Sequence, residues 1–522
     1  MIDEKINPEI IISKIIRKFD KKDLLIIITT FIVGIINNFY FIIGEGVAPD
    51  AVSPAWFNIA GNWEITLGRF GIKYINQLRY GFVSQFIVII ISLFLISVSI
   101  MIIKRIFNFK SNVGLVILTT LIACAPQFTE TYFFVYCADA YLFAFFCSIL
   151  SVYFLNKMGK NKLYMFLSIL FVIITCSIYQ AYLGVTIGLS LLLIIKQLIK
   201  NYNVKDVFIN FFKYMLIIFA GCVFYYILLK LILLINNLTL ASYKGANDLG
   251  LNTLIQMPKS IVQCYKDFFN FYFDNNIIFN SYYPRKEIFM IIFVLLILIS
   301  FITFCKSDLS KKNVRLLAIF LIVAIYPIGI NIMNIIAKGT KINLVTGPGL
   351  ITFFTIMLFL YEWSDKNLIV YLCKWLLILL FTMLSVSYII ENSYTYIARN
   401  ETYQNYKTTM TDIYYRAIAL NEYNEKSEWI FNNYYNFTVR DLNRTNGFIT
   451  HDNVTWKNYS GLLQNSSFFE KNLGVKIKMA SREKYNLIVN SEEFKAMPTY
   501  PKEGSVKIID GVVTVKISEN SL

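Results

Sequence analysis

Two acids, Glu45 and Asp50, stand in the polar stretch from Gly44 to Phe82, between two long apolar runs. Polar groups next to a membrane are costly and usually serve a function. A carboxylate that is close to bulk water yet bordered by apolar residues stays ionised and can act as a general base for a hydroxyl. We therefore predict that this loop, residues 45–81, carries the base of a membrane enzyme. A simple turn role for Asp50 after Pro49 is the alternative.

The same loop predicts an amphipathic helix that begins at Ser53-Pro54, a common pair at helix starts. Apolar residues recur there at spacings of three or four: Trp56, Ile59, Ala60, Trp63, Leu67, Phe70, Tyr74 and Leu78. The other face carries Arg69, so the helix is expected to lie in the membrane interface, with Gly68 as a point where it can divide. Glu64, after Trp63, is the third choice for the base. A surface helix without a catalytic task fits the same pattern.

Three further polar residues lie at the ends of apolar runs. Asp139 stands near the start of the run 139–155, where an acid either caps a helix through its dipole or belongs to a site. Tyr179 and Gln180 form the polar tip between two short runs, which could make a helical hairpin that does not cross the membrane fully. These three residues are candidates for substrate binding.

Three lysines are candidates for contact with an anionic group. Lys230 lies inside an apolar run, where it either snorkels to the surface or binds phosphate. Lys338 and Lys341 precede Thr346-Gly-Pro-Gly349 at the entry to another apolar run, where backbone N–H groups and cations together suit an anion. Lysines in such loops can also be merely solvated.

The elements that must position these residues are membrane spans. The chain has 522 residues, of which 57% are hydrophobic and 16% charged, far from the composition of a soluble protein. Runs long enough to cross a core of about 30 Å fall at 24–44, 82–103, 112–127, 139–155, 163–178, 181–195, 214–235, 287–304, 315–333, 348–362 and 368–390. These eleven runs predict an all-α polytopic protein with about eleven transmembrane helices over 24–390. Residues 1–23 precede the first run and form a separate amino-terminal segment.

The distribution of basic residues predicts the orientation. Segments on the amino-terminal side of the membrane hold 22 Lys and Arg, and the opposite loops, although longer in sum, hold 10. The positive-inside rule then places the amino terminus in the cytoplasm and the carboxyl end outside, in the cell membrane. The same bias accounts for the net charge of +16 without nucleic acid as a partner.

The last segment, 391–522, is polar and aromatic and predicts a small extracytoplasmic α/β domain. Helical patterning covers Thr402 to Tyr423, and strand-like alternation covers Val475–Met479 and Leu487–Val489. Asp510-Gly511 between two β-branched runs predicts a hairpin with a type I′ turn. A further helix on the membrane surface is expected in the aromatic-rich loop 236–286.

Several classes of chemistry are disfavoured by composition. The chain has one histidine, His451, and no pair of cysteines at metal-ligand spacing, so a zinc site or a Ser-His-Asp arrangement is not expected. We predict no metal and no cofactor. A polysaccharide or lipid transporter remains an alternative, although Lys230 is nearly the only ionisable residue within a run. A membrane acyltransferase would normally use a histidine base.

Four short motifs, in this order, carry a resemblance. They are Trp63 with Gly68-Arg69-Phe70, then Asp139-Ala-Tyr141, then Tyr179-Gln-Ala-Tyr182, and finally Met497-Pro-Thr-Tyr-Pro501 with Gly504-Ser505 and Val515-Lys-Ile517. With these motifs the chain resembles the serotype-converting glucosyltransferases (Gtr type II family) of bacteria and their phages. Relatives usually place an Asp-Asp pair before the loop tryptophan, whereas Pro54-Ala55 stand here and Asp50 is the nearest upstream acid.

The resemblance implies a GT-C-type enzyme that moves a hexose, glucose or a related sugar, from a polyprenyl-phosphate carrier to a cell-surface polysaccharide outside the membrane. Arg69 with Lys338 or Lys341 would hold the carrier phosphate, and Asp50, or else Glu45, would deprotonate the acceptor hydroxyl. Displacement with one base implies inversion at the anomeric carbon. No metal is needed because the cations can neutralise a monophosphate leaving group.

Overall fold

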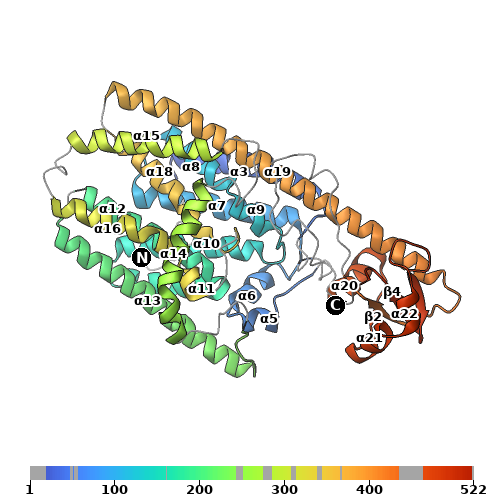
Figure 1. Ribbon diagram of the computed structural model, residues 1–522. Coiled ribbons are helices and arrows are strands. Elements are labelled where there is room, and N and C mark those ends of the chain that lie inside the picture. The colour runs from blue at the N-terminus through green and yellow to red at the C-terminus, as the bar shows by residue number, and fades with distance from the viewer. Residues whose placement is uncertain are drawn as a thin grey trace, which may run out of the picture.

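The computed structural model describes residues 19–47, 51, 57–159, 161–200, 202–242, 251–273, 285–306, 313–337, 344–364, 367–433 and 462–519, with the side chains of 251–254 and 462–467 left out. Most of these residues form a bundle of long helices, and a small sheet domain lies beyond one end of the bundle (Figure 1). We call the end of the bundle nearest the sheet domain the loop end.

Within the described residues, nine helical segments are long and apolar enough to cross a membrane. They are α3 (Lys21–Ile43), α7 (Gln85–Phe107), α8 (Asn112–Ala123) with α9 (Pro126–Tyr132), α10 (Ala138–Lys157), η1 (Gln180–Tyr182) with α12 (Leu183–Ile199), α13 (Val204–Ile235), α15 (Arg285–Lys306), α16 (Asn313–Ile330) and α19 (Leu368–Ile418). The shorter apolar helices α11 (Leu163–Ile178) and η3 (Pro348–Ile351) with α18 (Thr352–Glu362) bring each of the eleven predicted runs onto a helix. The protein is therefore a polytopic helical membrane protein.

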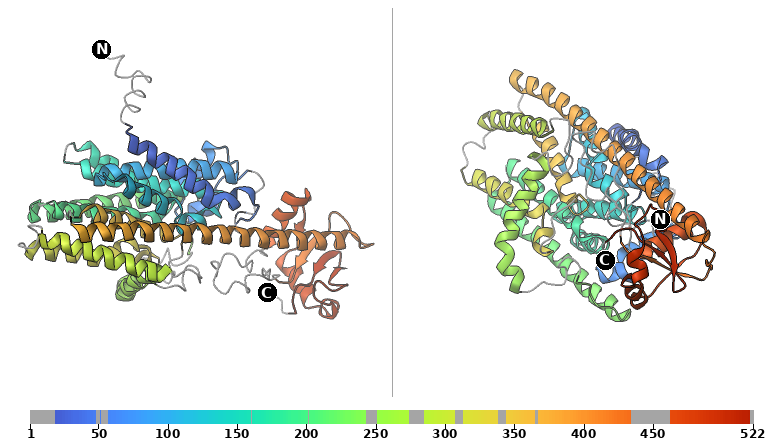
Figure 2. Two further views of the ribbon diagram at one scale, coloured as in Figure 1. Left: turned by 90° about the horizontal axis from the view of Figure 1, so that it is seen from above. Right: turned by 45° about the vertical axis from the view of Figure 1, so that its right-hand side comes forward.

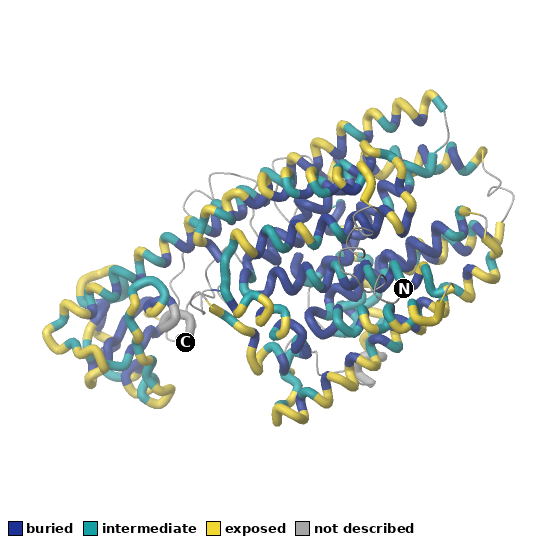
Figure 3. The backbone as a smooth tube through the Cα atoms, turned by 180° about the vertical axis from the view of Figure 1, so that it is seen from behind, coloured by how far each residue is buried: buried dark blue, intermediate teal, exposed yellow. Residues whose placement is uncertain are grey.

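The burial of the helices follows from their place in the bundle. Blue, buried backbone concentrates inside the bundle, and exposed positions lie on its outer helices (Figure 3). On α13, Phe212 and Leu216 are more than 60% exposed although they are apolar. Apolar side chains on the outside of a bundle are stable only in an apolar solvent, so this surface is suited to lipid.

The hairpin of α11 and α12 runs between the two ends of the bundle. At the loop end, Gly71 packs against Ser177 and Ile178 at the end of α11. At the other end, Lys196 of α12 donates to the carbonyl of Ile106, near the end of α7. The polar tip 179–180 therefore lies at the loop end, as its position in the sequence predicts.

The predicted loop helix is wrong in its first part and divided in its second. Residues 57–61 are not helical, because the backbone N–H of Asn58 donates to Gly81 O and that of Ala60 to the Asn76 side chain. Helix then forms in two pieces, α5 (Asn62–Thr66) and α6 (Gly71–Leu78), separated at Gly68 as expected. Ser53 and Pro54 lie outside the described residues.

Two further helices lie in the loops that follow. The aromatic-rich loop contains α14 (Leu251–Phe273), which crosses the direction of α15 and α19 (Figure 1). Its Cys264 carbonyl accepts a hydrogen bond from Asn331, and its Asp267 carboxylate accepts one from Asn334, in the short helix α17 (Met333–Ile336). The helix predicted there is thus confirmed, and it is held by α17 and the end of α16.

The longest element, α19, joins the bundle to the sheet domain. The helix runs through Ile390, where the composition becomes polar, without a break, and includes most of the helix predicted over Thr402–Tyr423. Seen from above, α19 extends well past the bundle into the sheet domain (Figure 2). The change of composition at residue 390 therefore falls inside one helix rather than at a helix end.

The sheet domain has strand order β2-β1-β4-β3, with β1 (Glu428–Phe431) parallel to both β2 (Lys478–Met479) and β4 (Val512–Val515). The predicted hairpin is confirmed: β3 (Val506–Ile509) pairs antiparallel with β4, and Asp510 and Gly511 both have positive φ. The helices α20 (Leu462–Leu473), α21 (Arg482–Val489) and α22 (Glu492–Ala496) complete the domain.

The strand predicted at Leu487–Val489 is wrong, because these residues end α21. The side chain of Ser481 accepts a hydrogen bond from the Lys484 N–H and caps this helix, a local signal that outweighs the short apolar run. The run Val475–Met479 forms a strand only at its last two residues.

Candidate active site

Gly68 and Arg69 connect α5 to α6 at the loop end and lie against three elements of the bundle. Gly68 has φ of +76°, a conformation that a side chain would strain. Its carbonyl accepts hydrogen bonds from the Tyr225 hydroxyl at 2.8 Å and from Gln180 Nε2 at 3.3 Å. Gln180 also donates to the Tyr225 oxygen at 2.7 Å. The turn is thus fixed to η1 and α13 through its backbone.

The guanidinium of Arg69 lies over the ring of one tyrosine and donates to the hydroxyl of another. Its centre is 4.4 Å from the ring centroid of Tyr179, and its Nη1 donates to the Tyr141 hydroxyl at 3.3 Å. The two tyrosine rings stack at 4.6 Å. Burial lowers the pKa of Arg69, but the nearby phenolic groups raise it above its ordinary value, so the cation is retained. The structure therefore brings together Arg69, Tyr179 and Gln180, three residues that the sequence suggested for substrate binding.

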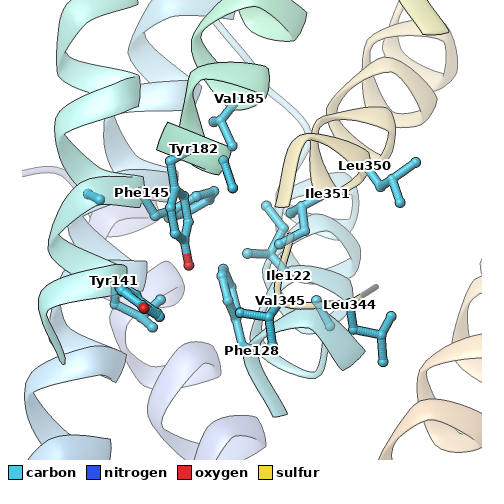
Figure 4. Close-up of a cluster of buried hydrophobic side chains, with 14 of the residues drawn as sticks. Ile122, Phe128, Tyr141, Phe145, Tyr182, Val185, Leu344, Val345, Leu350 and Ile351 are labelled. Atoms are coloured by element: carbon cyan, nitrogen blue, oxygen red, sulfur yellow. The ribbon is translucent and has the colours of Figure 1, made fainter. Parts of the chain in front are cut away.

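Tyr141 also faces the interior of the bundle. In Figure 4 its ring lies beside a buried apolar cluster that includes Phe128, Phe145 and Tyr182. The ring of Tyr182 is 6.1 Å from that of Tyr179. An arginine backed by a packed aromatic wall is held in one orientation and loses little rotamer freedom on binding an anion.

Asp139, in the first turn of α10, forms an ion pair with Arg79 of the loop 45–81. Its Oδ2 is 2.9 Å from Arg79 Nε, and the two side chains are only 4% and 9% exposed. Arg79 also donates to the carbonyls of Phe82 and Tyr136, and Asn76 donates to Tyr136 O at 2.7 Å. This cluster fastens the end of the loop to the start of α10.

Glu45 stands at the beginning of the loop, and its side-chain partners differ from those of Arg69. Its Oε2 accepts hydrogen bonds from Gln404 and Lys407 of α19, both at 3.1 Å. Burial raises the pKa of the Glu45 carboxyl, but the hydrogen bonds from Gln404 and Lys407 outweigh this and hold it below its usual value. A carboxylate with a lowered pKa is a weaker base.

The other sequence candidates have different surroundings. Glu64 caps its own helix by accepting from the Gly61 N–H at 2.7 Å. Lys230 is exposed near the end of α13, with its Nζ 5.4 Å from the ring centroid of Tyr226. Asp50, Lys338 and Lys341 lie outside the described residues.

Sequence reasoning missed Arg79, Asn76 and Tyr225 as residues that hold the site. Asn76 was visible on the polar face of α6, and Arg79 follows that helix directly. Tyr225 lies within an apolar span, and the sequence does not distinguish its hydroxyl from that of the neighbouring Tyr226. A buried acid, Glu130, was also missed; it lies in α9, the short helix that follows α8.

The structure thus gathers a cation, two tyrosines and an amide at one end of a polytopic helical bundle. Comparison with known families shows that the chain belongs to the family described as glucosyl transferase GtrII, which matches residues 56–361. The match includes the first three motifs on which the resemblance rests and confirms it. The protein is therefore a multi-pass membrane glycosyltransferase. No curated protein and no solved structure gives a significant match.

Proposed function

We propose that the protein transfers a hexose, glucose or a related sugar, from a polyprenyl-phosphate carrier to a cell-surface polysaccharide. The observation that supports this most is the Arg69 cation, held against Tyr141 and Tyr179 at the loop end of a lipid-facing bundle. A lipid-linked phosphate would lie at the same depth, with its chain among the helices. A guanidinium matches the geometry of phosphate oxygens and would neutralise the leaving group.

The reaction is a single displacement. Asp50, the first choice from sequence with Glu45 second, takes the proton of the acceptor hydroxyl. The hydroxyl oxygen forms a bond to the anomeric carbon while the bond from that carbon to the phosphate oxygen breaks. The electron pair leaves on the phosphate, whose charge Arg69 and the sequence candidates Lys338 and Lys341 compensate. The product has the inverted configuration, and this scheme requires no metal.

The contacts of the loop bear on the side at which the reaction occurs. The loop 45–81, the tip 179–180 and the continuation of α19 into the sheet domain share one end of the bundle. Together with the positive-inside bias, this supports the cytoplasmic amino terminus and an extracytoplasmic sheet domain in the cell membrane. The acceptor would then reach the site from outside.

The test is carrier-dependent transfer by the purified protein in vesicles, with synthetic polyprenyl-phosphate sugars and a polysaccharide acceptor. Wild type should consume the carrier-linked sugar, and Asp50→Asn should lower the rate by roughly 10²- to 10⁴-fold. Asp206→Asn, an exposed acid in the first turn of α13, is the matched control and should behave as wild type.

Two outcomes would contradict the proposal. Full activity of both Asp50→Asn and Glu45→Gln would exclude the assigned base. Movement of a lipid-linked glycan across the vesicle membrane without consumption of the carrier bond would favour the transporter instead.

A further inference from the structure

The beginning of the catalytic loop is fastened to one stripe of α19. The Glu45 backbone N–H donates to Asn400 Oδ1 at 2.8 Å, and its carboxylate accepts from Gln404 and Lys407 at 3.1 Å each. Residues 400, 404 and 407 are spaced by four and three, so they share one face of the helix. Both the backbone and the side chain of Glu45 therefore form hydrogen bonds with α19.

Gly46 lets the loop approach the backbone of α19 closely. A Cβ built on Gly46 would lie 2.6 Å from the Asn400 nitrogen and 2.8 Å from the Arg399 carbonyl carbon. These are backbone atoms of a helix and cannot move aside cheaply. The next residue, Val47, is 4% exposed. The contact is thus a close-packed joint rather than a single surface ion pair.

The sheet domain joins the same stretch of α19. Burial lowers the pKa of Lys471 in α20, and the charge of Glu45 partly offsets this. Farther along α19, within about three turns of Lys407, Tyr500 donates to Asp412 at 2.7 Å, and Arg416 donates to Pro501 O at 2.8 Å. A rigid helix therefore connects the loop entry with the domain that follows.

We propose that Glu45 and Lys407 are positioning residues that couple the loop entry to α19 and the sheet domain, and that Glu45 is not the base. This inference rests on the proposed function, because it concerns how the loop is held for sugar transfer. The carboxylate accepts hydrogen bonds from one cation and one amide of α19, Lys407 and Gln404. A group already hydrogen-bonded twice by its own protein is better suited to hold a geometry than to accept a proton from a substrate.

Charge exchange separates the two roles. Glu45→Lys should lower kcat/KM for sugar transfer by about tenfold or more, and Lys407→Glu by a similar factor, since each places like charges at the joint. The double variant restores opposite charges and should recover to within about threefold of wild type. A base at position 45 predicts instead that the double variant is as inactive as Glu45→Lys, and that result would overturn the proposal.

The matched control is an ion pair of the same domain that has no part in the joint. Glu492 and Lys495, paired at 2.7 Å on α22, are both more than half exposed. Exchange of these two charges should leave kcat/KM unchanged. Wild type without transfer activity would refute the proposed function, whereas an active wild type without rescue in the double variant would refute the positioning role alone.

A second measurement does not depend on activity. Glu45→Cys combined with Lys407→Cys in the full-length protein should be bridged by a short bifunctional maleimide, detected as a cross-linked peptide by mass spectrometry, because an ion pair between two long side chains need not bring their Cα atoms within the ~7 Å that a disulfide requires. Glu45→Cys with Lys495→Cys should not be bridged. The absence of the first cross-link from folded protein would overturn the joint itself.

Discussion

The two ends of the loop 45–81 are attached to the bundle by different kinds of contact. The far end is held by the buried pair Arg79–Asp139, whose side chains are at most 9% exposed. The near end is held by Glu45 and Lys407, which are 53% and 40% exposed. The first pair ties the loop to α10, inside the bundle, and the second ties it to α19, which leads to the sheet domain.

This difference assigns different roles to the two attachments. A buried ion pair cannot be opened cheaply, because each charge would be left without solvent. An exposed pair contributes little to stability and can be remade at low cost. The far end is therefore held by an ion pair that is costly to open, whereas the ion pair at the near end is cheap to remake and close packing of Gly46 against α19 also holds the chain there.

Asp139→Asn should give the largest change in stability. It leaves Arg79 buried without its carboxylate, which costs about 3–5 kcal/mol. Thermal unfolding of the detergent-solubilised protein should show the loss, and Arg79→Met with Asp139→Leu should regain at least half of it. An unchanged unfolding temperature in Asp139→Asn would show that the far end is no more firmly held than the near end.

Arg69→Lys should lower sugar transfer by about 10- to 100-fold while the protein stays folded. A lysine keeps the charge but loses the planar fork that contacts Tyr141 and stacks on Tyr179. Steady-state kinetics with carrier-linked sugar would measure this. Arg105→Lys serves as control and should stay within about twofold of wild type. Arg105 lies in the last turn of α7, where it is ion-paired with Asp23. Equal rates for Arg69→Lys and wild type would remove Arg69 from the site.

Gly68→Ala should destabilise the protein by about 1–2 kcal/mol. The positive φ alone costs about 1 kcal/mol, and the new Cβ would lie 2.9 Å from Gln180 Nε2 and against the Tyr225 hydroxyl. Chemical denaturation should be compared with Gly61→Ala, where a Cβ meets nothing within 4 Å and the expected loss is below about 0.5 kcal/mol. Similar losses in both variants would show that the turn is not fixed as described.

The near end should show the smallest effect, and one that depends on pH. The pKa of Glu45 is lowered in the folded protein, so its contribution is present above the ordinary carboxyl pKa and is lost as pH falls through the folded value. Because the pair is half exposed, we expect a change of about 0.5 kcal/mol or less. The stability difference between wild type and Glu45→Gln, measured at pH 7 and at pH 3.5, should shrink toward zero. A difference that grows in acid would contradict the pairing.

Much of the fold could be predicted because its signals are local. Each helix of the bundle follows an apolar run of the sequence, and the hairpin at Asp510-Gly511 follows from two turn residues between β-branched strands. The two errors have different causes, one tertiary and one local. The start of the loop helix failed because tertiary hydrogen bonds took the N–H groups of Asn58 and Ala60, and Leu487–Val489 failed because a serine cap favoured helix.

The residues of the site were recognisable by type, but their partners were not. The sequence alone determined a membrane protein of many spans, its family, and a loop with acids and an arginine at a membrane boundary. Only the tertiary structure decided that Arg69 meets Tyr141 and Tyr179, that Asp139 is paired with Arg79, and that Glu45 belongs to α19. The sequence could not show these pairs because the paired residues lie 60 to 362 positions apart. No local pattern encodes which helices pack together.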